Sequence, residues 1–243
     1  KKQFYRPNWD APLEVFPKEV PSDMPDIVFQ ISSGLYGTRD KNGKFDAYRY
    51  QKVMSFCQMT EIKIAQGAKQ TGGKLSGQKV TPAIAYYRNV EAYKDVFSPN
   101  RFPYANSIEE LFDFIGTLQE LSGKPVGMKI VISDMQNIEP YAKEIKRRVD
   151  LGIDAYPDYI TLDSGSGGSA TAPLEMMERV GLNVRDSVYL VNKVLTDYGV
   201  RDKVRIVASG KILTPDDIII VMSLGADFLQ IARGFMMSAG CIR

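Results

Sequence analysis

The chain has 243 residues, 44% of them hydrophobic and 25% charged, and its 31 basic and 29 acidic residues leave a net charge of +2. This length and composition suit one large globular domain, and so balanced a charge predicts no nucleic-acid partner. The sequence contains no histidine. It therefore excludes Ser-His-Asp and Cys-His hydrolases, histidine-ligated zinc sites and histidine general bases.

Cysteine use and the start of the chain bear on its compartment. The two cysteines, Cys57 and Cys241, provide no disulfide framework and fit a reducing compartment. No apolar run approaches the ~18 residues of a membrane span. The sequence has neither an initiator Met nor a signal-peptide pattern. We therefore expect a cytoplasmic protein, although the missing start leaves room for an upstream membrane anchor.

The first 25 residues differ from the rest in their proline content. They carry five prolines, too many for a helix or a central strand: Pro7, Pro12, Pro17, Pro21 and Pro25. We predict that residues 1–25 form an extended arm and that residues 26–243 form one domain.

From residue 26 onward, short apolar segments rich in β-branched and aromatic residues alternate with amphipathic ones. The former predict strands over residues 27–33, 61–66, 126–133, 159–163, 204–209 and 228–232. The latter predict helices over residues 46–56, 82–88, 107–121, 137–151, 185–198 and from 214 to about 225. Such alternation predicts an α/β fold with a parallel sheet, either doubly wound or a (β/α)8 TIM barrel.

The loops after the strands favour the barrel, because several of them carry ligand-type residues and the last two resemble phosphate sites. A closed barrel needs eight strands, whereas the sequence predicts six. We therefore expect an incomplete barrel with about strands 3–8 present, and favour a fragment over a further strand hidden at residues 13–16. Its open edges would invite a missing segment or a partner chain to complete it.

The loop after the second predicted strand carries an amide, two amines and several glycines. Gln66, Lys69 and Lys74 offer directional and ionic contacts, while the glycines let backbone N–H groups approach a ligand. Arg88, on the short predicted helix that follows, has two interpretations. It forms a clamp for a dicarboxylate together with Lys69, or it is a solvated helix residue.

Residues 163–169 follow a buried type of strand and read Asp-Ser-Gly-Ser-Gly-Gly-Ser. Their glycines and hydroxyls predict a backbone cradle for an anion, and a flexible surface loop is the alternative. The residues that we expect to form the cradle are Ser164, Gly165, Gly167 and Gly168.

Two further segments stand where the seventh and eighth strands of a barrel end, a frequent place for phosphate binding. They are Ser209-Gly210-Lys211 and Ala232-Arg233-Gly234. Arg233 suits a bidentate contact with a phosphate, or alternatively an ion pair with a carboxylate at the edge of the core.

Lys129 lies inside a predicted strand, Val-Gly-Met-Lys-Ile-Val-Ile. Facing the lumen, it requires an anion or an electron-rich partner such as the N1–C2=O edge of a reduced flavin. Facing outward, it extends between helices into solvent. The sequence leaves both orientations open.

Taken together, these segments resemble the FMN-binding synthase domain of glutamate synthases, in particular the small stand-alone, flavin-containing, glutamate-synthase-related group. The resemblance covers residues 26–243. The matching segments are residues 62–69, 72–81, 98–102, 123–131, 163–173, 208–216, 224–235 and 240–242.

The resemblance implies FMN over the mouth of the barrel, with its phosphate in the last loops and Lys129 beside the ring. It also implies that Gln66, Lys69 and Arg88, with Lys74, bind 2-oxoglutarate, or the 2-iminoglutarate formed from it with ammonia. Hydride transfer from the reduced flavin then gives L-glutamate, with Lys129 and Gln66 as the catalytic residues. The sequence does not say whether ferredoxin or NADPH supplies the electrons.

Some positions depart from the pattern of the family. Lys74 stands where the large synthases carry a Gln, Ser166 where an acidic residue is usual, and Ala170 where a glycine is usual. These departures leave open an FMN barrel enzyme with another substrate, or a catalytically silent flavin-binding or assembly domain. A 2-hydroxy-acid oxidase is disfavoured because such enzymes use a His base.

The family also carries a 3Fe-4S cluster, of which Cys241 matches the first of three Cys ligands. The chain ends two residues later. One thiolate cannot hold a cluster, so we expect none in the chain as given.

Overall fold

The computed structural model describes residues 22–68, 73–168, 172–173 and 175–241. Most of the predicted N-terminal arm, residues 1–21, lies outside this range, as does Lys69.

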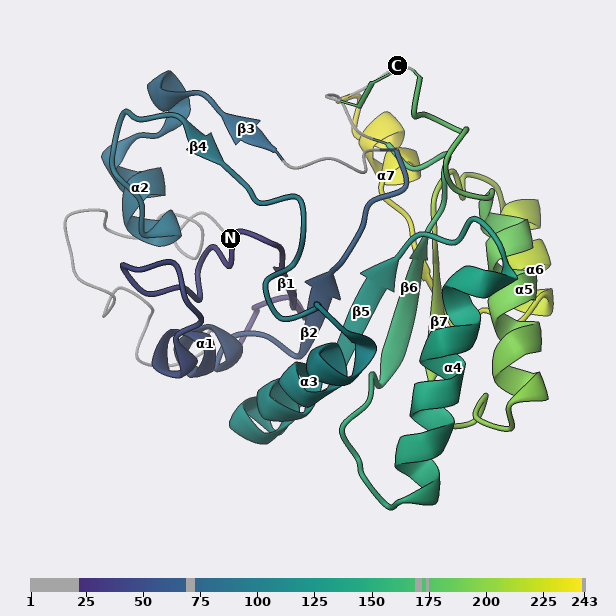
Figure 1. Cartoon of the computed structure of the whole chain (residues 1–243). Helices are drawn as coiled ribbons and strands as arrows, with labels where there is room; N and C mark the ends of the chain where they lie inside the picture. Colours follow the sequence, from purple (N-terminus) through teal and green to yellow (C-terminus); the bar gives the residue numbers. More distant parts are fainter. Residues whose placement is uncertain (1–21, 69–72, 169–171, 174, 242–243) are drawn as a thin grey trace.

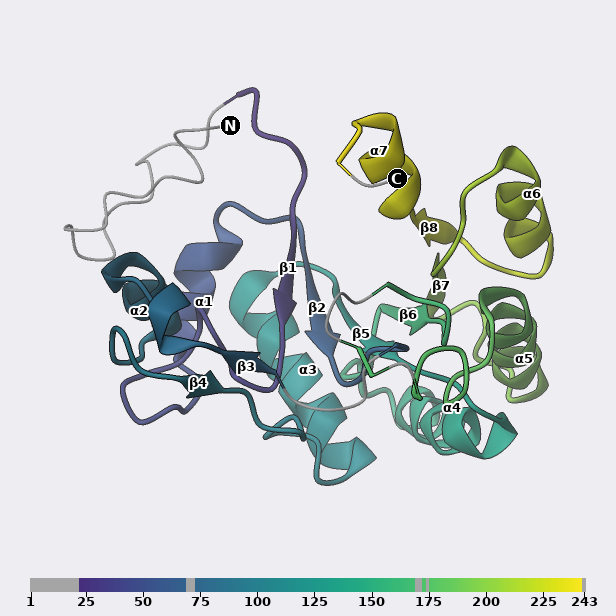
Figure 2. The same ribbon diagram turned by 90° about the horizontal axis from the view of Figure 1, so that it is seen from above.

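Six parallel strands form the central sheet, in the order β1-β2-β5-β6-β7-β8. Their bounds are Val28–Ile31 for β1, Met59–Lys63 for β2, Val126–Ile130 for β5, Tyr159–Asp163 for β6, Arg205–Ser209 for β7 and Phe228–Gln230 for β8. Seen from above, the strands follow an arc with helices on its outer side (Figure 2). The prediction of an incomplete (β/α)8 barrel is confirmed.

The helices that cover the sheet are α1 (Ala47–Met54), α3 (Ile108–Ser122), α4 (Met135–Asp150), α5 (Val184–Asp197) and α6 (Pro215–Ser223) (Figure 1). Each of these five helices begins at a side chain that accepts a backbone N–H, which satisfies one of the free donors of the first turn. In α6, Thr214 and Asp217 form a capping box, and Pro215 occupies the first turn.

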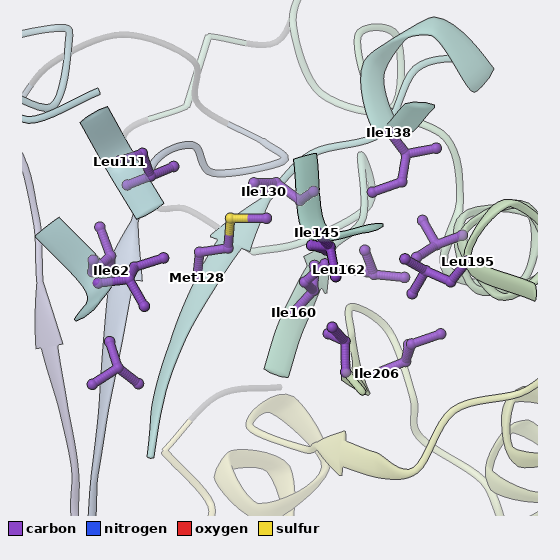
Figure 3. Close-up of a cluster of buried hydrophobic side chains, with 14 of the residues drawn as sticks. Ile62, Leu111, Met128, Ile130, Ile138, Ile145, Ile160, Leu162, Leu195 and Ile206 are labelled. Atoms are coloured by element: carbon purple, nitrogen blue, oxygen red, sulfur yellow. The ribbon is translucent and has the colours of Figure 1, made fainter. Parts of the chain in front are cut away.

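The alternation of side chains along the strands separates the core from the lumen. Ile31, Ile62, Met128, Ile160 and Ile206 are in register across five neighbouring strands and fully buried. Figure 3 shows four of them packed with apolar side chains of the helices. Because successive residues of a strand point to opposite faces, the residues between these apolar positions point into the lumen.

A small unit is inserted between β2 and α3. It contains the antiparallel strands β3 (Lys74–Leu75) and β4 (Val96–Phe97), the 3-10 turn η2 (Gly77–Lys79) and α2 (Pro82–Arg88). Val80, Ala85 and Val96 form its own small core. Figure 1 shows it beside the sheet, next to α1.

One short helix, α7 (Arg233–Ser238), follows β8 and lies above the carboxyl ends of the strands (Figure 1). None of the described helices is long and apolar enough to cross a membrane.

Candidate active site

A cavity of about 550 Å³ lies at the carboxyl ends of the strands, the end at which barrel enzymes bind their ligands. The loops after β2, β6, β7 and β8 line it, together with residues of the strands themselves. This volume falls within the usual range for cofactor sites.

The loops after β6 and β7 approach each other so closely that glycine is required between them. Gly210 has a φ of +121°, and a Cβ at this position would lie 2.0 Å from Ser164 Oγ. The N–H of Ser164 donates to the carbonyl of Ser209 at 3.0 Å. The close approach fixes the backbone at this wall of the cavity.

The loop after β2 meets the same β6 loop from the other side. The N–H of Gly67 donates to Asp163 Oδ2 at 2.9 Å. A Cβ on Gly67 would lie 1.8 Å from the carbonyl oxygen of Ser164. These contacts hold the neighbouring Gln66 at the wall of the cavity.

Two cations line the cavity from the loops after β7 and β8. Arg233 begins α7, and a Cβ on Gly168 would lie 2.9 Å from its Nη2 atom. Lys211 has a φ of +49°, which is uncommon for a residue with a side chain, and its ammonium group pairs with Glu178. The hydrogen bond from Lys211 holds the pKa of Glu178 below its usual value.

Lys129 is a third cation, at the floor of the cavity. Its neighbours Met128 and Ile130 are buried in the core, so Lys129 points into the lumen. The orientation that the sequence left open is thereby settled. Its Nζ atom lies 3.9 Å from Oε1 of Glu61 on β2, and its side chain is only 13% exposed.

The donor set fits a flavin mononucleotide. Arg233, Lys211 and the glycine-rich loops offer cations and close backbone approach to a phosphate. Met177, Ile212 and Met236 line the same cavity and offer apolar contacts to a ring system.

The cavity brings together nine of the residues singled out from the sequence: Gln66, Lys129, Gly167, Gly168, Ser209, Gly210, Lys211, Ala232 and Arg233. Three others lie close to it without lining it. Ser164 and Gly165 are the first two residues of the β6 loop, and Gly165 packs against Gly181. Gly234 is the second residue of α7.

Two predicted substrate ligands lie in the inserted unit and do not line the cavity. Lys74 pairs with Asp95 at 2.7 Å, and this contact lowers the pKa of Asp95. The Arg88 guanidinium lies over the ring of Tyr36, 4.6 Å from its centroid. Lys69, the third, is outside the described residues.

Cys241 is exposed and free. Within the described part of the chain, no group of three or more His, Cys, Asp or Glu residues could hold a metal ion.

Several residues of the site escaped sequence reasoning. Asp163, Met177, Ile212, Gln230 and Met236 line the cavity, and Glu61 lies beneath Lys129. A signal for Glu61 was available: it is an acid in an alternating strand, and an inward Lys129 requires an anion.

The family profile described as "Conserved region in glutamate synthase" matches residues 15–243. The chain belongs to the glutamate synthase family. It is 40% identical over 220 residues to the glutamate synthase large subunit-like protein YerD of Bacillus subtilis (strain 168), covering 90% of this chain and 41% of YerD. It is 32% identical over 228 residues to the archaeal-type glutamate synthase [NADPH] of Thermotoga sp. (strain RQ2), covering 93% of this chain and 41% of that protein.

The chain thus spans about 41% of the length of these two relatives of the glutamate synthase family. Among solved structures, deoxyribose phosphate aldolase from Aeropyrum pernix aligns with a TM-score of 0.46 at 11% identity, over 86% of this chain and 65% of that chain.

Proposed function

We propose that this member of the glutamate synthase family binds FMN in the cavity at the strand ends. We further propose that it belongs to an oxidoreductase that reduces 2-iminoglutarate, formed from 2-oxoglutarate and ammonia, to L-glutamate. The observation that carries the proposal is the convergence of Arg233, Lys211 and Lys129 on one glycine-walled cavity. The names of the archaeal-type relatives favour NADPH over ferredoxin as the electron source.

The phosphate of FMN is assigned to Arg233, to the glycine-rich loops after β6 and β7, and to Lys211, which must exchange its ion pair with Glu178 to reach it. Arg233 suits this role because its planar guanidinium can donate two parallel hydrogen bonds to a phosphate. Lys129, at the floor, is assigned to the electron-rich edge of the ring. When bound, FMN supplies the hydride for the reduction.

The substrate side is assigned to Gln66, which lines the cavity and has both donors and an acceptor for a carboxylate or an imine. Lys69, Lys74 and Arg88 remain proposed ligands of the second carboxylate. Since Lys74 is paired with Asp95 and Arg88 is stacked on Tyr36, both must exchange these contacts to reach a substrate in the cavity. Because the two cysteines fit a reducing compartment, we propose a cytoplasmic location for the enzyme.

The flavin assignment is tested by titrating FMN into the flavin-free natural full-length protein and following flavin fluorescence. Arg233→Ala is expected to weaken FMN binding by about 1.5–3 kcal/mol, the range for a lost charged hydrogen bond. Arg185→Ala is a matched control, because Arg185 pairs with Asp217 on the outer surface. Absence of FMN binding by the parent protein would reject the flavin assignment, and equal affinity in both variants would reject the role of Arg233.

A further inference from the structure

A buried carboxylate lies in the lumen directly beneath the proposed flavin site. Glu61 of β2 is only 2% exposed. Its Oε1 atom accepts a hydrogen bond from Gln30 Nε2 at 2.5 Å, and its Oε2 atom accepts one from Thr161 Oγ1 at 2.6 Å and one from Gln230 Nε2 at 3.3 Å. These three donors come from β1, β6 and β8, so most of the sheet takes part in holding this one side chain.

The three donors fix the position of the carboxylate but do not balance its charge. A buried carboxylate is costly unless it is paired with a cation. Among the ion pairs of the described residues, Glu61 has Lys129, with 3.9 Å between Oε1 and Nζ. The pairing benefits both groups, since the Lys129 side chain is itself mostly buried.

The two partners differ in how firmly they are held. The Glu61 side chain is short and receives hydrogen bonds from three strands. Lys129 ends a flexible four-carbon stem and lines the cavity. Without an anion at the floor, a lysine side chain favours an arrangement that carries its ammonium group to water.

We infer that Glu61 is the positioning residue for Lys129: its carboxylate, held by three strands, keeps the ammonium group at the floor of the cavity, pointed at the bound ring. The assignment of the ring as the target rests on the proposed function. The ion pair itself does not, so the two can be tested separately.

The position of Lys129 is tested without flavin. The natural full-length protein is treated with acetic anhydride at low ratio, and acetylation of each lysine is followed by peptide mass spectrometry. Glu61→Gln is expected to raise the rate at Lys129 at least tenfold, because the amine loses the partner that shields it. Lys124, which donates to the carbonyls of Met54 and Cys57, reports any general unfolding and is expected to stay within twofold of the parent.

Three further variants sharpen this test. Glu144→Gln changes another buried glutamate, paired with Arg148 on α4, and should leave the Lys129 rate unchanged. Thr161→Val removes one neutral donor and keeps the charge, so the rate should stay within twofold. If Glu61→Gln does not fold, Glu61→Asp withdraws the carboxylate by one methylene and should raise the rate at least threefold. An unchanged Lys129 rate in the folded Glu61 variant would overturn the inference.

The second measurement is the midpoint potential of bound FMN at fixed pH. Lys129→Met and Glu61→Gln are each expected to lower this potential. The expected fall corresponds to at least a tenfold loss of affinity for reduced FMN relative to oxidised FMN. In the Lys129→Met background, Glu61→Gln should cause no further fall, because residues that act through one another are not additive. Equal effects of Glu61→Gln in both backgrounds would refute action through Lys129.

The outcomes separate the inference from the proposed function. A protein that binds no FMN, but whose Lys129 becomes reactive in Glu61→Gln, refutes the flavin assignment and retains the ion pair. A protein that binds FMN, but whose Lys129 acetylation rate does not change in Glu61→Gln, retains the flavin assignment and refutes the role of Glu61.

Discussion

Gly67→Ala perturbs the tightest backbone approach at the cavity. The added methyl carbon would lie 1.8 Å from the carbonyl oxygen of Ser164 and 2.9 Å from that of Asp163. Since an ordinary contact between carbon and oxygen is about 3.3 Å or more, the loops after β2 and β6 must separate by roughly 1.5 Å. The obstacle is backbone on both sides, so no side-chain rotation relieves it.

The cost follows from two contributions. Overpacking at a site that cannot relax costs about 1–3 kcal/mol. Separating the loops also breaks the hydrogen bond from the Gly67 N–H to Asp163, and a bond to a charged group contributes about 1.5–3 kcal/mol. We therefore expect Gly67→Ala to lower the free energy of unfolding by about 2.5–6 kcal/mol and to weaken FMN binding at least tenfold.

The assay is urea denaturation followed by circular dichroism, combined with an FMN fluorescence titration. Gly73→Ala is the matched control, because a Cβ there would meet only Ser98 Oγ, at 3.9 Å. A Gly67→Ala protein within ~0.5 kcal/mol of the parent, the range of an ordinary surface substitution, would refute the argument that these two loops are locked together.

Two other substitutions test the fold. Ile160→Ala should lower the free energy of unfolding by about 2–5 kcal/mol, measured by urea denaturation, since Ile160 is fully buried in the core; a loss under 1 kcal/mol would contradict its placement. Hydrogen bonds from the N–H groups of Leu213 and Thr214, the former the larger cause, lower the pKa of Asp217 to about 2. The ionised Asp217 therefore stabilises the folded protein at pH values above the pKa that this carboxyl has in the unfolded chain, and this stabilisation is lost as the pH falls towards 2. Asp217→Asn should therefore show a smaller fall in unfolding free energy between pH 5 and pH 2.5 than the parent, and an equal fall would contradict this.

The sequence predicts the parts of the fold that have a clear local pattern. All six strands of the central sheet were found, and α2 matches its predicted range of residues 82–88. Each of these segments has a local pattern, of period 2 or 3.6, that already agrees with its final environment.

The short elements of the inserted unit could not be found in this way. The strands β3 and β4 have two residues each, too few for any periodicity, and exist because their neighbours pack around Val80 and Val96. The arginine and glycine at residues 233 and 234 predict a phosphate-binding loop, whereas the structure has the six-residue helix α7 there.

The site was partly predictable for a related reason. Loop residues after strands gather at one end of any parallel sheet, so Gln66, Gly168, Lys211 and Arg233 could be placed together without coordinates. The direction of Lys129, by contrast, depends on the register of β5 between its neighbours, and the burial of Glu61 depends on donors from three other strands. Arg88 depends on how the inserted unit packs on Tyr36. These long-range contacts have no signature in a local pattern. For Glu61 the sequence indicates only that an acid stands in an alternating strand and could serve as the anion that an inward Lys129 requires.

The reaction proposed for this cavity is the reduction of an imine of 2-oxoglutarate, with bound FMN as the hydride source. The most direct measurement is a single turnover. The natural full-length protein is loaded with FMN, reduced without oxygen, and mixed with 2-oxoglutarate and ammonium while flavin absorbance is followed and glutamate is assayed. We predict that the flavin reoxidises with one glutamate formed per flavin, and that Gln66→Ala slows this reaction while FMN remains bound. Flavin that stays reduced in the presence of both substrates would contradict the claim.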